Sequence, residues 1–155
     1  MLEKDTNDLG TTIHFDQKNF NTFGLRVYNL FFLACNLFEN AAKEIERNPN
    51  SDMGDWKKNP TISGLSETVL TFKPTGYKFK PLKGLGYRFV RYRTLTWWND
   101  YNSTKHELSL HKATLQNLIF ALGSAGILVE IIAFPGGITG SNPSILFGNV
   151  YIPEI

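Results

Sequence analysis

The sequence predicts one mainly α-helical domain, with a small extended insertion around residues 67–90 of its 155. Three observations support this prediction. Hydrophobic residues make up 42% of the chain against 19% charged residues, enough for one core at this length. Long stretches before and after the insertion repeat apolar residues at the three- and four-residue steps of helices. The insertion itself has short alternating runs separated by Pro and Gly, as strands do.

The first element predicted is a long amphipathic helix that starts near Asn19, with Asn19 or Asn21 as its cap. It is expected to end at 48–51, because Pro49 disfavours helix in the residue before it. Residues 1–18 are polar, and we expect them to be flexible or to become ordered only by docking on the rest. The apolar positions of the predicted helix are Phe20, Phe23, Val27, Leu30, Phe31, Ala34, Leu37, Phe38, Ala41 and Ile45.

After the first helix, the chain is expected to change character several times. Residues 51–60 are predicted to be a polar linker, and a tail at 138–155, rich in Gly and Pro, is expected to be an irregular arm. Between them the pattern predicts short strands at 69–72, 77–79 and 87–90, and helices at about 96–108 and 110–134.

The last helix contains the most apolar part of the chain. Residues 118–129 carry no charge, but twelve residues are too few to cross a membrane, so we expect a buried core helix. The small residues at 123–126 allow either a close crossing with another helix or a symmetric partner.

Two features of the sequence predict the cellular location of the protein. The lone cysteine, Cys35, cannot form an intramolecular disulfide, and residues 1–20 contain no apolar run of the kind found in secretion signals. We therefore expect a cytoplasmic protein with no membrane association.

Charge is segregated along the chain although the formal net charge is only +2. The net charge is −2 over residues 1–50, +6 over 51–112 and −2 over 113–155. Basic and aromatic side chains alternate in the middle part, which suits single-stranded nucleic acid, because cations contact phosphates and rings stack on bases. The alternative is a solvated strand whose aromatic residues face inward. The candidate nucleic-acid-binding residues are Lys78, Lys80, Arg88, Arg91, Arg93 and Trp98.

The most unusual segment is Trp-Trp-Asn-Asp-Tyr-Asn-Ser-Thr-Lys-His at 97–106. On a helix, five of its side chains fall within one face about 140° wide. Lys and Asn on that face suit a phosphate, and the histidine titrates near neutral pH and can move a proton. The alternative is that the polar groups hydrogen-bond to a neighbouring helix while the tryptophans fill the core. The five residues are Trp98, Tyr101, Asn102, Lys105 and His106.

Other catalytic patterns are weak. His106 and His111 are poorly spaced for two metal ligands on one helix, and no Cys or Glu completes a set, so we expect no metal and no cofactor. Cys35 lies among apolar neighbours and is predicted to be a core residue rather than a nucleophile.

The Trp-Trp-x-x-Tyr-Asn-x-x-Lys-His core, followed by Ala113-Thr114-Leu115-x-Asn117 and an apolar helix, resembles uncharacterised bacterial proteins of the HEPN superfamily. This resemblance implies an all-α domain of the kind frequent in phage defence and toxin systems. Active HEPN ribonucleases carry Arg, a polar residue, three further residues and His. The resemblance places Tyr101 at the arginine position of this pattern, Asn102 at the polar position and His106 at the histidine position.

Two functions are therefore open. The first is a non-catalytic or weakly catalytic HEPN-like module that acts in defence or toxin–antitoxin regulation by binding protein or RNA. The alternative is a metal-independent endoribonuclease at a dimer interface, with His106 as acid or base, Asn102 as orienter, Lys105 as phosphate ligand and Tyr101 as auxiliary donor. A small-molecule or nucleotide-binding role is a third possibility. The expected partners are a second copy of the chain, packed through 96–108 and 110–134, together with RNA or a protein of such a system.

Overall fold

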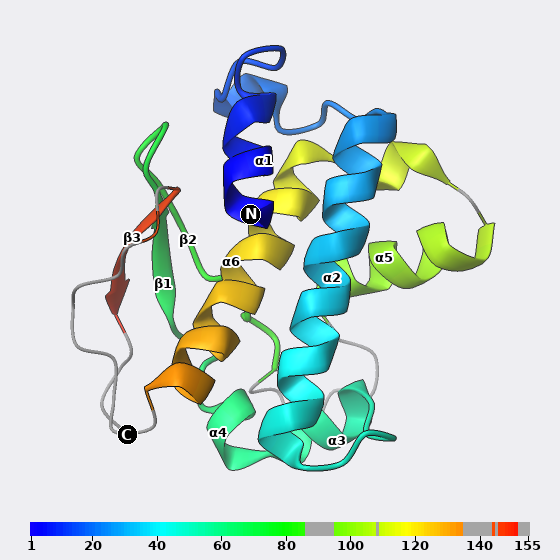
Figure 1. Ribbon diagram of the computed structural model, residues 1–155, viewed down its shortest axis with the longest axis vertical. Helices are drawn as coiled ribbons and strands as arrows, with labels where there is room; N and C mark the ends of the chain where they lie inside the picture. The colour runs from blue at the N-terminus through cyan, green and yellow to red at the C-terminus, as the bar shows by residue number, and fades with distance from the viewer. Residues whose placement is uncertain (86–94, 108, 135–143, 145, 152–155) are drawn as a thin grey trace.

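The computed structural model describes residues 1–85, 95–107, 109–134, 144 and 146–151. In that part, the protein is mainly helical with a small three-stranded antiparallel sheet, as predicted. Helix α6 lies between the sheet and α2, and α5 lies on the side away from the sheet (Figure 1). The elements are α1 (Leu2–Leu9), η1 (Gln17–Asn19), α2 (Leu25–Glu46), α3 (Met53–Lys58), α4 (Pro60–Ser63), β1 (Val69–Phe72), β2 (Tyr77–Phe79), α5 (Thr96–Glu107), η2 (Leu110–Lys112), α6 (Leu115–Ala133) and β3 (Phe147–Tyr151).

The N-terminal segment is not a flexible tail. Residues Leu2–Leu9 form α1, and Thr6 and Leu9 are buried. The helix packs on α2, so the alternative that residues 1–18 become ordered by docking fits the structure better. A short polar helix of this kind is stable only through such packing, because isolated helices of this length are marginal in water.

Helix α2 begins at Leu25, and neither Asn19 nor Asn21 caps it. The segment before it forms backbone hydrogen bonds with the first turn of α6 instead. These bonds join residues far apart in sequence, and helical periodicity carries no information about them. Two positions of the predicted apolar face, Phe23 and Leu37, are exposed.

The predicted linker at 51–60 is wrong, because it contains α3 and the start of α4. Asp52 and Asp55 form a capping box, in which each side chain accepts a hydrogen bond from the other residue's backbone N–H. Trp56 anchors the segment: its ring is fully buried and its Nε1 donates to Ser51 Oγ at 3.0 Å. This buried indole places α3 beside α2 and α5.

The sheet has the strand order β2-β1-β3, with both pairs antiparallel. The hairpin of β1 and β2 confirms the predicted strands at 69–72 and 77–79, while the one at 87–90 lies outside the described residues. Strand β3 corrects the expected irregular arm at 138–155. The backbone N–H and C=O groups of β3 pair with the edge of β1 that β2 leaves free. The sequence of β3 alone does not indicate this partner.

Helix α6 is the central core element. Thr114 caps its start, accepting a hydrogen bond from the Asn117 N–H at 3.2 Å. By length and composition it is also apolar enough to span a membrane, but 56% of its most apolar window is buried inside the protein. The absence of a side chain at Gly123 allows close packing against the sheet rather than against another helix, because a Cβ there would lie 2.7 Å from Leu70 Cδ1.

Candidate functional site on helix α5

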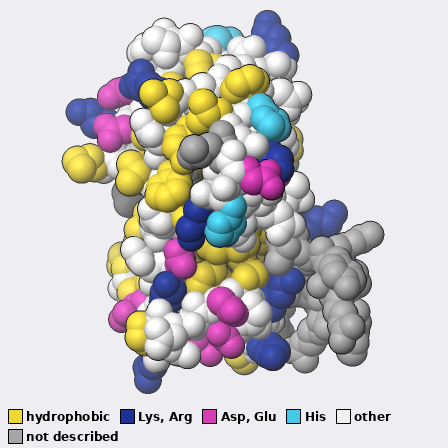
Figure 2. All heavy atoms as spheres, turned by 90° about the vertical axis from the view of Figure 1, so that its right-hand side faces the viewer, with side chains coloured by type: hydrophobic (Ala, Val, Ile, Leu, Met, Phe, Trp, Pro, Cys, Tyr) yellow, Lys and Arg dark blue, Asp and Glu magenta, His cyan; other side chains and the backbone are white. Residues whose placement is uncertain are grey.

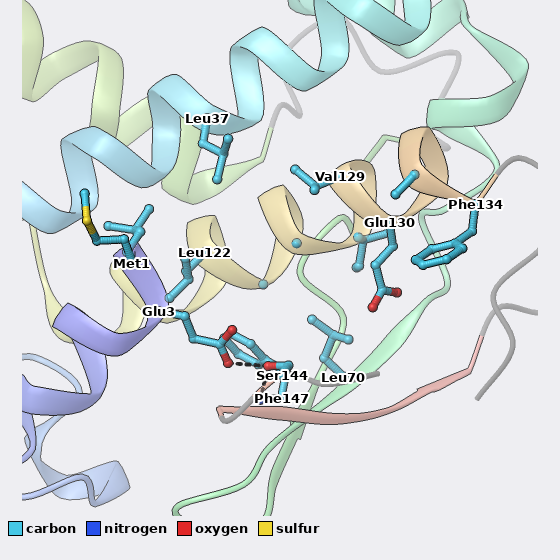
Figure 3. A pocket seen from close by; sticks show the side chains of 15 residues that line it. Met1, Glu3, Leu37, Leu70, Leu122, Val129, Glu130, Phe134, Ser144 and Phe147 are labelled. Atoms are coloured by element: carbon cyan, nitrogen blue, oxygen red, sulfur yellow. Dashed lines mark hydrogen bonds between the residues drawn. The ribbon is translucent and has the colours of Figure 1, made fainter. Parts of the chain in front are cut away.

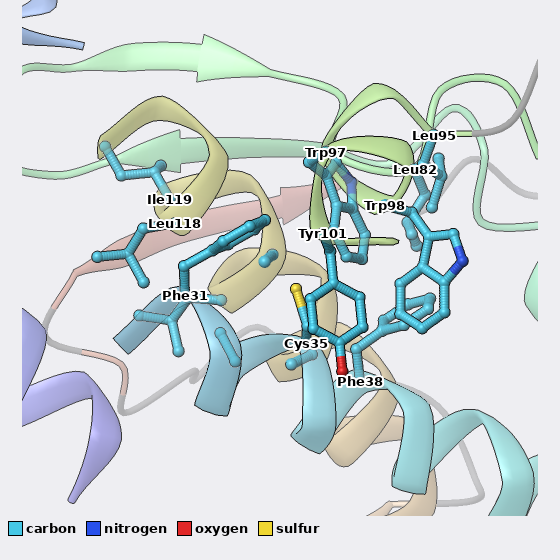
Figure 4. Packing of buried hydrophobic residues seen from close by; sticks show 14 of the residues in the cluster. Phe31, Cys35, Phe38, Leu82, Leu95, Trp97, Trp98, Tyr101, Leu118 and Ile119 are labelled. Carbon is cyan, nitrogen blue, oxygen red and sulfur yellow. The ribbon is translucent and has the colours of Figure 1, made fainter. Parts of the chain in front are cut away.

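The face predicted to carry chemistry is divided between the core and solvent. Helix α5 buries Trp97, Trp98, Tyr101 and Thr104. The Trp97 Nε1 donates to the Pro81 carbonyl at 2.9 Å, which fixes the inner side of the helix. Figure 4 shows the two indoles and the Tyr101 ring directed toward α2.

Tyr101 belongs to the core, which corrects its predicted role as an auxiliary donor to phosphate. It is 1% exposed, and its ring packs edge-on against Phe31 and Phe32. Its hydroxyl donates to Asn36 Oδ1 at 3.2 Å. Burial, with a smaller contribution from Cys35 and other neighbours, raises the pKa of Tyr101 to about 12. The residue at the arginine position of the HEPN pattern therefore contacts α2.

Trp98 does not offer a free ring for base stacking, as had been predicted. It is 7% exposed and packs against three rings, with centroid distances of 5.7 Å to Phe38, 5.5 Å to Trp56 and 5.2 Å to Tyr101. A base cannot stack on a ring whose faces are already covered by other side chains.

The three remaining site residues lie at the outer side of α5. Asn102 is half-buried, whereas Lys105 and His106 are exposed. Lys105 Nζ lies over the Tyr101 ring, 5.5 Å from its centroid, in a cation–π contact.

Asn102 and Lys105 share a recess of about 300 Å³ that also receives side chains from α2 and α3. Its other members include Glu39, Asp52 and Trp56, and His106 is not among them. We call this the α5 recess. The structure thus joins two of the three predicted groups and adds two carboxylates that the sequence interpretation missed. The Asp52-x-x-Asp55 spacing is a signal for the helix start, but the sequence holds no signal that this start lies beside α5.

Charge in the α5 recess is mixed. Lys105 is the one cation among the described residues that line it, and Glu39 and Asp52 are the anions. Glu39 already pairs with Lys43 of the same helix, with 3.2 Å between Nζ and Oε1. Over the wider face, side chains of both signs are interspersed (Figure 2).

In its described part, which ends at residue 85, the basic segment contains a solvated strand, the alternative to a base-stacking surface. Phe72 and Phe79 face the core, and Lys78 is exposed on β2. Lys80 pairs with Glu67, and this hydrogen bond, followed by the lysine's charge, lowers the pKa of Glu67. The remaining predicted contacts, Arg88, Arg91 and Arg93, lie outside the described residues.

The other reactive groups are accounted for structurally. Cys35 is fully buried, and burial is the main cause that raises the pKa of its thiol, so it is held as a protonated core residue. No group of three His, Cys, Asp or Glu side chains within the described ranges could hold a metal ion.

The fold and the recess define a mainly α-helical protein with a small antiparallel sheet and a mixed-charge recess on α5. No family model, curated protein or solved structure matches the chain.

Proposed function

We propose that the chain is a non-catalytic HEPN-like module of a defence or toxin–antitoxin type system, which acts in the cytoplasm by binding protein through the α5 recess. The observation that carries this proposal is the burial of Tyr101, at 1% exposure, where the resemblance calls for a phosphate-binding arginine. The resemblance of the 97–106 motif supports the HEPN assignment and the class of system.

Catalysis is disfavoured by what surrounds the remaining groups. A cation that faces the developing charge of a phosphoryl transition state contributes several kcal/mol, about 3–4 by comparison with oxyanion donors. Lys105 is the nearest candidate, but it shares its recess with Glu39 and Asp52, whose carboxylates repel a phosphodiester. His106 is exposed and is not among the residues that line that recess.

Protein binding suits the same geometry, and a second copy of the chain is the first partner we propose. A twofold interface must be self-complementary, because the same patch meets itself. The α5 recess meets this requirement, since it places the Lys105 ammonium beside the carboxylates of Glu39 and Asp52.

Reversal of one charge tests the dimer. The Lys105→Glu change should raise the dimer dissociation constant at least tenfold, about 1.4 kcal/mol, because a third carboxylate would join Glu39 and Asp52. Sedimentation velocity over a concentration series measures this constant. Lys4→Glu, an exposed lysine on α1, is the matched control and should leave it unchanged. A chain that is monomeric at every concentration, or a dimer unaffected by Lys105→Glu, contradicts the proposal.

A nuclease assay tests the alternative function. Mixed single-stranded RNA should remain intact with the wild-type chain, with or without chelator, and the His106→Ala variant should behave identically and melt at the same temperature, since His106 is exposed. Chelator-resistant cleavage that disappears in His106→Ala would establish the endoribonuclease instead.

In the same preparation, Lys78→Ala with Lys80→Ala should leave RNA affinity and its salt dependence unchanged. A fall in both would show an RNA-binding strand.

A further inference from the structure

A second hollow, of about 410 Å³, lies among α1, α2, α6 and the sheet, and none of its lining residues comes from α5. Its walls are mostly apolar. The side chains that define it for this argument are Leu37, Leu70, Val129, Glu130, Phe134 and Phe147 (Figure 3). We call it the α6 groove.

The α6 groove is open where Gly126 lies. A Cβ built on this glycine meets no atom within 4 Å, so the helix surface there is bare rather than packed. Leu37 and Val129 flank the opening and are 39% and 40% exposed. These apolar side chains contact water on both sides of the opening. Covering them with an apolar molecule is favourable, because it removes apolar surface from water.

One wall contains an unsatisfied acid. Glu130 Oε2 is shielded from solvent and has no hydrogen-bond partner among the described residues, and burial raises the pKa of this carboxyl group. In Figure 3 the carboxyl group lies between Leu70 and Phe134. A buried polar atom without a partner is destabilising, and a cation beside this carboxyl group stabilises its charged form.

The other carboxylate of the groove is already used. Glu3 accepts hydrogen bonds from the Leu146 N–H at 2.6 Å and from the Ser144 hydroxyl, and these bonds tie α1 to the start of β3. Of the two acids among the described residues that line the groove, Glu130 is therefore the one whose carboxyl group does not tie two elements together.

We propose that the α6 groove binds a small amphipathic amine, with its hydrocarbon body against Leu37, Val129 and Phe134 and its ammonium group on Glu130. Charge complementarity selects this class. A fatty acid would bring a second carboxylate against Glu130, and a neutral alcohol would supply a donor without a compensating charge. The volume lies within the range of small-molecule sites, about 300–1,000 Å³.

Calorimetric titration of the full chain with octylamine, octanoate and octanol tests this proposal. Octylamine should bind with one-to-one stoichiometry and at least ten times more tightly than either of the other two. The Glu130→Gln change should remove most of that preference, because it keeps the shape of the side chain and deletes the charge. Glu44→Gln, which alters an exposed acid on α2, is the control and should bind octylamine like the wild type.

A second variant fills the groove. Leucine at position 126 has open space to occupy and is a better helix former than glycine, so Gly126→Leu should fold normally and lose octylamine binding. If circular dichroism shows that Gly126→Leu folds poorly, the result with Glu130→Gln alone tests the proposal. Equal binding of octylamine and octanoate, or full affinity in Glu130→Gln, overturns the proposal. The proposal is also overturned if octylamine does not bind and the chain forms a dimer that Gly126→Leu dissociates. The groove would then be an interface between copies.

Discussion

Arginine in place of Tyr101 should lower the free energy of unfolding by about 3 kcal/mol or more, even though it restores the arginine of the HEPN ribonuclease pattern. The tyrosine ring is 1% exposed and packed against α2, and its hydroxyl has Asn36 as its partner. A guanidinium at this position would lose its hydration, and the amide oxygen of Asn36 cannot neutralise its charge. Urea unfolding followed by tryptophan fluorescence measures the loss.

Tyr101→Phe is the matched control. It keeps the ring contacts and removes only the hydrogen bond to Asn36, so it should cost about 0.5–1.5 kcal/mol. If Tyr101→Arg instead folds with unchanged stability, residue 101 is accessible and the buried position described here is wrong. Gain of chelator-resistant RNA cleavage by that variant would further return the site to the ribonuclease alternative.

Phe38→Ala should cost about 3–5 kcal/mol of stability, among the largest losses available to a single truncation in this chain. The Phe38 side chain is 0% exposed and joins α2 to both α3 and α5. Its ring centroid lies 5.9 Å from that of Trp56, 5.0 Å from Trp97 and 5.7 Å from Trp98. Its removal leaves a cavity among three indoles that cannot all move inward at once.

The same substitution at an exposed phenylalanine provides the control for Phe38. Phe23 is 55% exposed, and its backbone bridge to Thr114 does not depend on the side chain, so Phe23→Ala should change stability by about 0.5 kcal/mol or less. Thermal unfolding by circular dichroism compares the two variants directly. Equal losses would show that the aromatic cluster around Phe38 is not the centre of the core.

Part of the candidate site was predictable from the residues of α5. The helix itself, and the position of Asn102, Lys105 and His106 along it, follow from local spacing. Which edge of the helix faces the core does not, because apolar and polar residues are not separated cleanly around it. The predicted face, about 140° wide, joined the buried Tyr101 to the exposed Lys105, since spacing alone cannot say where α2 lies.

The residues that complete the α5 recess were beyond local reasoning. Glu39 comes from α2 and Asp52 from the start of α3, and only the packing of Trp56 against Phe38 and Trp98 brings them beside α5. Glu130 of the α6 groove is a similar case. Its sequence neighbours predict a core helix, whereas the shielding of its Oε2, without a hydrogen-bond partner among the described residues, depends on the elements packed around α6.

Composition and periodicity by themselves determined the mainly helical class, the body of α2, α5 and α6, and the hairpin of β1 and β2, because these features depend on contacts a few residues apart. The tertiary structure alone decided the start of α2 at Leu25, the order in the N-terminal helix, the pairing of β3 and the burial of Tyr101. Each of these depends on a partner distant in sequence, whose hydrogen bonds or apolar surface outweigh the weak local preference of the segment.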